Sequence, residues 1–421
     1  MEKFATPQKN TRYAYVASLW GANPGYVLGA LVLGQAIRRR GSKHDLVLMH
    51  TDELPVSSRR FLSQVWTLRK VEYIAADKHL FHVMGTRFDG VFTKLHALGL
   101  VEYTKVLMLD LDLAVLQNVD DLFELPAPAA MHRGGTSLPH GTRIDGRHWF
   151  AGEFLHPDSD AYNWGQHGGI NAGVMLLEPN LELHQRTLQE VSLKLHPERI
   201  PGAGPEQDYL SRLFAPFWTH INVKYNYQLH HVFFALEALL EHIKSGEADN
   251  WTPERLQLET QDIRIVHFSG EMKMWDRVPF NNESDAICAE AVLRDCSPDK
   301  VRLWIDRAGE DWEYLREGLR PGSNLCCTSN DVSVESALEL GIKRVQSAAE
   351  QAARQWREDF ESLPTTFPHW PALPELIRQL HEPEWPADAT FQRGARVELY
   401  HRDEEWFPGT VVAMPARPDK Q

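Results

Sequence analysis

The sequence predicts an α/β fold in which a mostly parallel, Rossmann-like sheet is flanked by helices. A helical C-terminal extension and a small β-like tail follow this sheet. Between residues 13 and 269, short apolar runs alternate with segments of helical period, which implies parallel strands joined by helices. Beyond Ser329, apolar residues recur every three or four positions, as in one long amphipathic helix. The length of 421 residues fits one large unit and a smaller one.

The elements follow one another in a regular order. Apolar runs predict strands at residues 13–20, 44–50, 70–75, 105–116, 168–179 and 263–269. Segments of helical period predict helices at residues 25–40, 205–214 and 338–356. In such sheets, ligands bind beyond the carboxyl ends of the strands. The segment 132–167 is rich in Gly, His, Arg and aromatic residues, which favours an ordered lid or substrate wall over a disordered loop.

Two acids, Asp110 and Asp112, stand inside the apolar run 105–116. An ionised carboxylate taken out of water costs several kcal/mol unless it is paired, hydrogen-bonded or bound to a metal. Alternation along a strand places both acids on one face at its carboxyl end, where they can share a divalent cation. Such a pair alone is weak evidence, because caps, turns and salt bridges use the same residues.

Further stretches strengthen the metal interpretation. His267 ends a predicted strand and can supply an imidazole ligand, and Lys273 can reach a phosphate. In "GGINAGVMLL", Asn171 can approach a ligand closely, although the stretch also suits a plain strand entry. In "PEQDYL", Gln207 and Asp208 fall in the first turn of a helix, where acids are also ordinary stabilisers of the helix N-terminus.

Together and in this order, these stretches resemble glycosyltransferase family 8, the retaining nucleotide-sugar transferases that include glycogenin and galactinol synthase. The resemblance runs from Tyr13 to about Trp275. It is carried by "NPGYVLGALVLGQAI", "FTKLHAL", "KVLMLDLDLAVL", "NAGVMLL", "PEQDYLSRLF" and "HFSGEMKMW". The resemblance implies a GT-A fold that uses a UDP-sugar donor and Mn²⁺, with Mg²⁺ as an alternative.

The resemblance also implies roles for individual residues. Asp110, Asp112 and His267 match the metal ligands. The matches to nucleotide-binding positions are Asn23 and Tyr26 for the uridine, Gly270 and Lys273 for the diphosphate, and Leu111 between the two acids. The matches around the donor sugar are Lys94, Asn171, Gln207 and Asp208, of which Lys94, Gln207 and Asp208 are the catalytic candidates. Retention can proceed by double displacement, for which Gln207 is a poor nucleophile and Asp208 a better one, or by front-face attack within a short-lived ion pair.

One departure from the family pattern concerns glycogenin. Counting from the Tyr225-Asn226 pair, the tyrosine that glycogenin glucosylates falls on Phe233. We therefore expect no self-glucosylation at this position.

The interpretation that follows is a metal-dependent, UDP-sugar-dependent retaining hexosyltransferase that moves glucose or galactose to an acceptor hydroxyl. The alternatives are a glucuronosyltransferase of the same fold and a catalytically silent GT-A scaffold. The acceptor can be a glycan, a polyol, a lipid or a protein, and a homodimer is left open. The net charge of -14 argues against a general nucleic-acid or anionic-membrane partner.

The expected location is cytoplasmic. The longest apolar run, at residues 26–37, is shorter than the about 20 residues that a transmembrane helix needs, and the N-terminus shows no apolar signal region. Sequons at Asn250 and Asn282 leave a lumenal or Golgi location open.

The sequence suggests four regions. These are a GT-A domain at 11–280, a helical extension at 281–363, a Pro-rich linker at 364–386 and a short tail at 387–421. Two β-like runs in the tail look like the opening of a Tudor or SH3-like barrel, with too few residues to close one.

Overall fold

The computed structural model describes ten stretches of the chain, which fall into two units, Met1–Leu380 and His381–Gln421. The described stretches are 11–74, 90–132, 139–144, 169–192, 205–229, 262–269, 273–277, 334–381, 396–400 and 406–410. Several sequence-based predictions lie outside them, namely those on Gly270, Phe233, Asn250, Asn282 and most of the segment 132–167.

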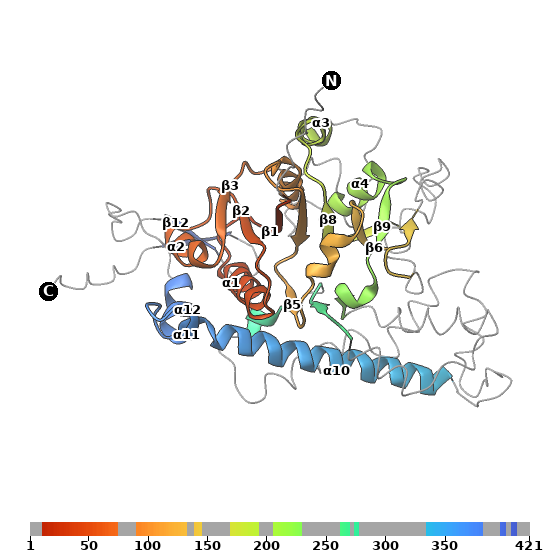
Figure 1. The fold of residues 1–421 in the computed structure, drawn as a ribbon. Helices are drawn as coiled ribbons and strands as arrows, with labels where there is room; N and C mark the ends of the chain where they lie inside the picture. The colour runs from red at the N-terminus through yellow and green to blue at the C-terminus, as the bar shows by residue number, and fades with distance from the viewer. Residues whose placement is uncertain are drawn as a thin grey trace, which may run out of the picture. The chain divides into compact units, whose positions relative to one another are not determined.

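An eight-stranded sheet forms the centre of the larger unit (Figure 1), with strand order β3-β2-β1-β4-β8-β6-β9-β7. The strands β8 and β7 run antiparallel to their neighbours, and the other strand pairs of the sheet are parallel. The strands are β1 (Tyr13–Leu19), β2 (Asp45–His50), β3 (Thr67–Lys70), β4 (Lys105–Leu109), β6 (Ala129–His132), β7 (Arg143–Ile144), β8 (Ile170–Leu177) and β9 (Trp218–His220). The predicted mostly parallel sheet is confirmed.

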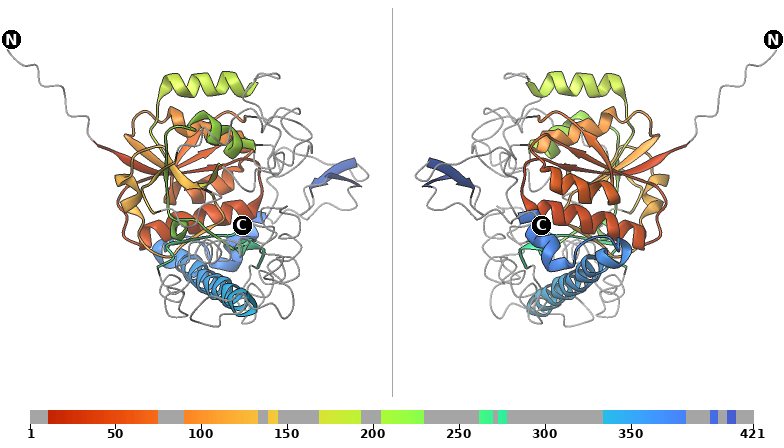
Figure 2. Two further views of the ribbon diagram at one scale, coloured as in Figure 1. Left: turned by 90° about the vertical axis from the view of Figure 1, so that its right-hand side faces the viewer. Right: turned by 90° about the vertical axis from the view of Figure 1, so that its left-hand side faces the viewer.

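Helices cover both faces of this sheet (Figure 2). Because side chains alternate along a strand, Tyr15 and Ala17 of β1 pack with α1, and Ala14 and Val16 pack into a second core on the other face. The helical elements of these two layers are α1 (Pro24–Arg39), α2 (Val56–Val65), η1 (Val91–Gly99), η2 (Asp120–Glu124), α3 (Leu181–Ser192) and α4 (Pro205–Leu213).

The C-terminal helices pack on α1. They are α10 (Val334–Glu361), α11 (Leu363–Thr366) and α12 (Leu373–His381). Trp356 of α10 is 2% exposed and belongs to the same core cluster as α1. Residues 364–381 form part of the stretch predicted to be a linker, yet Leu376 of α12 is fully buried in that cluster. The regular spacing of apolar residues in α12 explains how a proline-containing segment forms a packed helix.

A smaller sheet with order β10-β11-β5 lies beside the main one. It consists of β5 (Leu113–Val115), β10 (Tyr227–Gln228) and β11 (Ile265–His267), and it is flanked by η6 (Val223–Tyr225) and η8 (Met274–Arg277). The run 105–116 is therefore two strands in two sheets rather than one strand. The acids lie at the turn between these strands, because β5 pairs with β11 instead of continuing along the main sheet.

The third strand lies a few residues earlier than predicted. The apolar run suggested 70–75, whereas β3 ends at Lys70 and three of its four residues are exposed. Its parallel pairing with β2 sets its position, and an edge strand with polar side chains leaves little trace in the apolar pattern.

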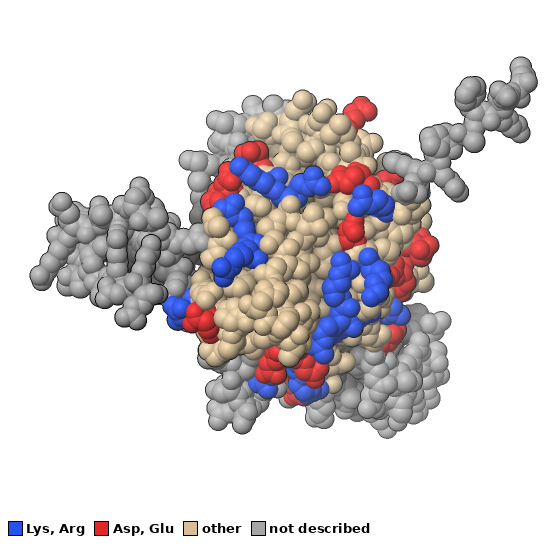
Figure 3. Space-filling model, turned by 60° about the vertical axis from the view of Figure 1, so that its left-hand side comes forward, with Lys and Arg blue, Asp and Glu red and all other residues tan. Residues whose placement is uncertain are grey.

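The surface carries charges of both signs. On the face drawn in Figure 3, Lys and Arg side chains are interspersed with Asp and Glu. Surface ion pairs include Arg12 with Asp45 and Arg69 with Glu102.

The smaller unit contains an antiparallel hairpin of β12 (Arg396–Tyr400) and β13 (Trp406–Thr410).

Among the described helices of the whole chain, none combines the length and the apolar character needed to cross a bilayer.

Candidate functional site

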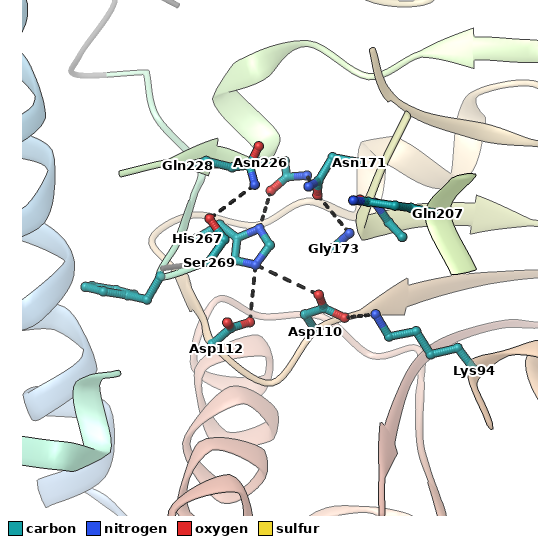
Figure 4. Close-up of polar contacts among 12 residues, drawn as sticks. Lys94, Asp110, Asp112, Asn171, Gly173, Gln207, Asn226, Gln228, His267 and Ser269 are labelled. Carbon is teal, nitrogen blue, oxygen red and sulfur yellow. Dashed lines mark hydrogen bonds and ion pairs between the residues drawn. The ribbon is translucent and has the colours of Figure 1, made fainter. Parts of the chain in front are cut away.

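Three predicted metal ligands converge at the junction of the two sheets (Figure 4). Asp110 and Asp112 lie in the turn between β4 and β5, and the pairing of β5 with β11 brings His267 opposite Leu113. The Nε2 atom of His267 lies 3.2 Å from Asp112 Oδ1 and 3.9 Å from Asp110 Oδ2. One ligand atom from each of the three residues lies within 4.8 Å of the others.

Lysines neutralise both acids in this low-exposure site. Lys94 Nζ lies 2.6 Å from Asp110 Oδ1, and Lys273 Nζ lies 2.5 Å from Asp112 Oδ2. Burial raises the pKa of Asp112, but its ion pair with Lys273 and its contact with His267 outweigh burial, so this pKa is well below its usual range. Asp112 is therefore ionised at neutral pH and available as a ligand.

Lys94 bridges two acids from distant parts of the chain. Its Nζ also lies 3.2 Å from Glu206 Oε1 at the start of α4. Burial lowers the pKa of Lys94, but the carboxylates of Asp110 and Glu206 outweigh it and the pKa is raised. Glu206 was not among the predicted site residues, because an acid in the first turn of a helix is explained equally well as a helix stabiliser.

Behind His267 lies a chain of amide groups. The Nδ1 atom of His267 lies 2.8 Å from Asn226 Oδ1, and Asn226 Nδ2 donates to Asn171 Oδ1 at 2.8 Å. The backbone amide of Gly173 donates to the same Asn171 oxygen at 2.9 Å. Asn226 was not predicted as a site residue, and its only signal in the sequence was its place beside Tyr225.

The predicted sugar-side residues lie on the β8 and α4 side of the cluster. In Figure 4, Gln207 lies next to Asn171 and Gly173, and its Oε1 accepts a hydrogen bond from the Ala172 amide at 3.4 Å. Gln207 is half-buried, whereas Asp208 is 2% exposed. The structure thus brings Lys94, Asn171 and Gln207 toward one place, and Asp208, the next residue of α4, is buried.

The predicted nucleotide-side residues surround the start of α1. Asn23 caps this helix by accepting a hydrogen bond from the Gly25 amide at 2.8 Å. The ring of Tyr26 lies 4.9 Å from that of Trp275, which places η8 and the neighbouring Lys273 against α1. Leu111 is buried between the two acids.

The donor set fits a divalent cation. Two carboxylates and one imidazole suit ions such as Mn²⁺ that accept both oxygen and nitrogen ligands. Because Nδ1 of His267 faces an amide oxygen, its Nε2 is the nitrogen that points at the acids. The residues present therefore fit a divalent cation, the class of cofactor that the family resemblance implies.

Asp110, Asp112 and His267 thus form one cluster, and Lys273 contacts it through Asp112. The chain matches the model of Glycosyl transferase family 8 over residues 23–278. It belongs to this family, so the predicted family and its GT-A fold are confirmed.

Proteins from a virus and from plants are similar to this chain over part of its length. An uncharacterised protein, R707 of Acanthamoeba polyphaga mimivirus, is 32% identical over 70% of this chain and 92% of its own length. Galactinol synthase 1 of Arabidopsis thaliana is 26% identical over 69% of this chain and 85% of its own length. Inositol phosphorylceramide glucuronosyltransferase 1 of the same plant is 29% identical to this chain. The aligned region covers 44% of this chain and 27% of that protein.

Proposed function

We propose that this family 8 glycosyltransferase moves glucose or galactose from a UDP-sugar to an acceptor hydroxyl with retention of configuration. The observation that carries the proposal is the convergence of Asp110, Asp112 and His267 within 4.8 Å, in contact with Lys273. These three side chains would hold Mn²⁺, or Mg²⁺ as the alternative. A bound ion supplies neutralisation of the charge that develops on the departing diphosphate.

The lysines have separate tasks in this proposal. Lys273 contacts Asp112 and the carbonyl oxygen of Phe268, at the edge of the cation site, where an ammonium can stabilise a phosphate. Lys94 holds Asp110 and Glu206 in fixed positions through its two ion pairs. Preorganised charges of this kind lower the barrier because they need no rearrangement during the reaction.

The two possible routes to retention of configuration, double displacement and front-face attack, differ in how well the site supports them. A nucleophile for double displacement has to reach the anomeric carbon, and Asp208 is 2% exposed. Gln207 is more accessible and carries only an amide oxygen. Burial of the better nucleophile supports front-face attack, with Gln207 and Asn171 holding the donor sugar.

The charge of the site supports a neutral hexose. A uronate donor carries a carboxylate that needs a cationic partner inside the site. Among the residues described around the cluster, Lys94 and Lys273 already contact carboxylates. Glucuronate stays the alternative donor because several relatives are named glucuronosyltransferases. The acceptor, the compartment and homodimer formation stay predictions.

Thermal unfolding and donor hydrolysis test this proposal together. Mn²⁺ with UDP should raise the melting temperature of the wild type by mass action, and Asp112→Asn should remove both this shift and UDP-sugar hydrolysis. The matched control is Asp262→Asn, since Asp262 is an acid with a 52% exposed side chain paired to Lys224. It should behave as the wild type does.

Parallel assays with UDP-glucose, UDP-galactose and UDP-glucuronate identify the donor. Turnover of UDP-glucuronate alone would contradict the hexose assignment. Tight UDP binding without hydrolysis or transfer for any donor would favour the silent scaffold.

A further inference from the structure

We propose that Asn226 is a positioning residue that fixes the proton of His267 on Nδ1 and so presents Nε2 as a metal ligand. The inference rests on the proposed function, because it concerns the cation site of that function. It depends on the direction of three successive hydrogen bonds, which link Gly173 to Asn171, Asn171 to Asn226, and Asn226 to His267.

The first of these bonds has only one direction. The backbone amide of Gly173 can donate but cannot accept, so the Asn171 side-chain atom 2.9 Å away is an oxygen. Side-chain amides are often ambiguous because their oxygen and nitrogen look alike. Here a backbone group removes the ambiguity for Asn171.

The direction then passes to Asn226. Its side chain meets the Asn171 oxygen at 2.8 Å, and an acceptor needs a donor opposite it, so the Asn226 group there is NH2. The other end of the same amide is therefore an oxygen. That oxygen lies 2.8 Å from Nδ1 of His267, so Nδ1 carries a proton. Asn226 is fully buried and His267 is 3% exposed, so a reversed amide would lose these partners away from solvent.

Gly173 also makes room for the imidazole. A Cβ atom at this position would lie 2.3 Å from Cε1 of His267 and 2.7 Å from its Nδ1. The carbonyl oxygen of Gly173 accepts the backbone amide of Asp110 at 2.9 Å. One residue therefore starts the hydrogen-bond chain, borders the ring and positions one of the acids.

The tautomer decides whether His267 can bind a cation. A neutral imidazole offers one lone pair, and a protonated Nδ1 leaves it on Nε2, which faces Asp112 at 3.2 Å. With the proton on Nε2, the ring would donate to Asp112 and present no lone pair to an ion. An acceptor on the far side of a metal-ligating histidine typically sustains its affinity and orientation.

The same hydrogen bonds constrain Asn171. Its Oδ1 accepts from Gly173 and from Asn226, so both lone pairs of this oxygen are used. Only its NH2 group is left to face the donor sugar, where it would donate to a sugar oxygen.

Two substitutions of Asn226 separate positioning from folding. Asn226→Leu removes the acceptor for Nδ1, and the affinity for Mn²⁺, titrated calorimetrically with saturating UDP, should fall by about 10- to 100-fold. Asn226→Asp loses the NH2 bond to Asn171 but retains an acceptor oxygen, so its affinity should stay at or above that of the wild type. Asn222→Ala is the matched control, because Asn222 caps η6 in the same segment through the Lys224 amide.

The outcomes distinguish the inference from the proposed function. A wild type that binds no Mn²⁺ with UDP overturns both. A wild type that binds Mn²⁺ while Asn226→Leu binds it equally overturns the inference alone. Equal losses in Asn226→Leu and Asn226→Asp would show a purely structural role and would also overturn it.

A direct measurement covers the case in which the leucine variant does not fold. Nitrogen NMR of the ¹⁵N-histidine-labelled wild type, loaded with diamagnetic Zn²⁺ and UDP, reports which ring nitrogen carries the proton. The His267 signal is assigned by its absence in His267→Gln. A proton on Nδ1 supports the inference, and a proton on Nε2 overturns it.

Discussion

Gly29 illustrates how a single missing side chain shapes this site. A Cβ at this position of α1 would lie 2.4 Å from Cζ3 of Trp275 and 2.9 Å from the Leu111 carbonyl oxygen. Because Trp275 stands two residues after Lys273, the glycine lets η8 approach α1 closely enough to bring that lysine to Asp112. The contact of Lys273 with Asp112 thus depends on a residue that has no side-chain chemistry of its own.

We predict that Gly29→Ala weakens UDP binding through Lys273. The added methyl group should displace Trp275, lower the unfolding free energy by about 1 to 3 kcal/mol and raise the dissociation constant for UDP with Mn²⁺. Urea unfolding and UDP titration measure the two effects. Gly34→Ala is the control, because its Cβ would collide with Val65 and Trp66 in the same helix layer. It should lose stability without losing UDP affinity, and equal UDP affinities in both variants would contradict the coupling.

His220 provides a prediction on pH. Its side chain is fully buried, and burial, with smaller effects of His132 and His140, lowers its pKa to about 4 from an ordinary 6.5. As the pH falls, His220 is protonated in the unfolded chain near pH 6.5 but in the folded chain only near pH 4. The folded chain therefore loses stability as the pH falls through this window. At 1.36 kcal/mol for each unit, the loss is on the order of 3 kcal/mol.

His220→Asn should flatten this part of the stability profile. The amide oxygen can replace Nδ1 as acceptor for the His132 backbone amide, which lies 3.2 Å from it, and it does not titrate. Urea unfolding at several pH values between 4 and 7 measures the difference. Parallel profiles for the wild type and the variant would contradict the prediction, because they would show that the pKa of His220 is the same in the folded and unfolded chains.

At the scale of elements, the apolar runs predicted most of the structure, because buried parallel strands have an unmistakable composition. The runs at 13–20 and 44–50 correspond to β1 and β2, and the helix at 25–40 corresponds to α1. The division of 105–116 into β4 and β5 could not be predicted, since pairing with β11 is a contact between residues more than a hundred positions apart.

The candidate site was predictable only where residue chemistry is distinctive. Acids inside an apolar run stand out, and so does a histidine at a strand end. Glu206 and Asn226 do not, because a helix-start acid and a lone asparagine have common structural explanations. Their roles depend on Lys94 and His267 lying opposite them in the fold.

The contact between α10 and α1 gives a prediction at this scale. Asp359 accepts from Arg39 and Arg40 at 2.7 Å each, and its side chain is 2% exposed. Asp359→Asn leaves Arg40, with a 10% exposed side chain, without its charged partner. We expect the unfolding free energy to fall by about 3 kcal/mol, measured by urea denaturation.

An exposed ion pair in α12 serves as the control. Glu375 pairs with Arg378 one turn later, and both side chains are largely in solvent. Glu375→Gln should change stability little, because exposed pairs contribute little in water. Similar losses of unfolding free energy in the two variants would show that burial does not determine how much Asp359 contributes to stability.

At the scale of the whole molecule, the C-terminal helices cover part of the hydrophobic core that supports the candidate site. Trp356, Phe360 and Leu363 are nearly or fully buried in the cluster that also contains Leu111 and Leu113 on either side of Asp112. Gln35 of α1 donates to Ser362 at 2.9 Å and to Thr366 at 2.6 Å. The described helices α10 and α11 therefore share a core with the elements that carry the candidate site, and none of the candidate site residues named above lies in these two helices.

The position of the last buried helix predicts where the chain can be shortened. A chain that ends at residue 381 keeps α10 to α12 and should retain the wild-type melting temperature and rate of UDP-sugar hydrolysis, because every described site residue and core helix is present. A chain that ends at residue 333 loses Trp356, Leu363 and Leu376 and exposes the apolar face of α1, so it should unfold or aggregate. Circular dichroism melting and hydrolysis assays on the two shortened chains measure this. A folded 381-residue chain with more than tenfold slower hydrolysis would instead show that residues beyond 381 contribute to the site.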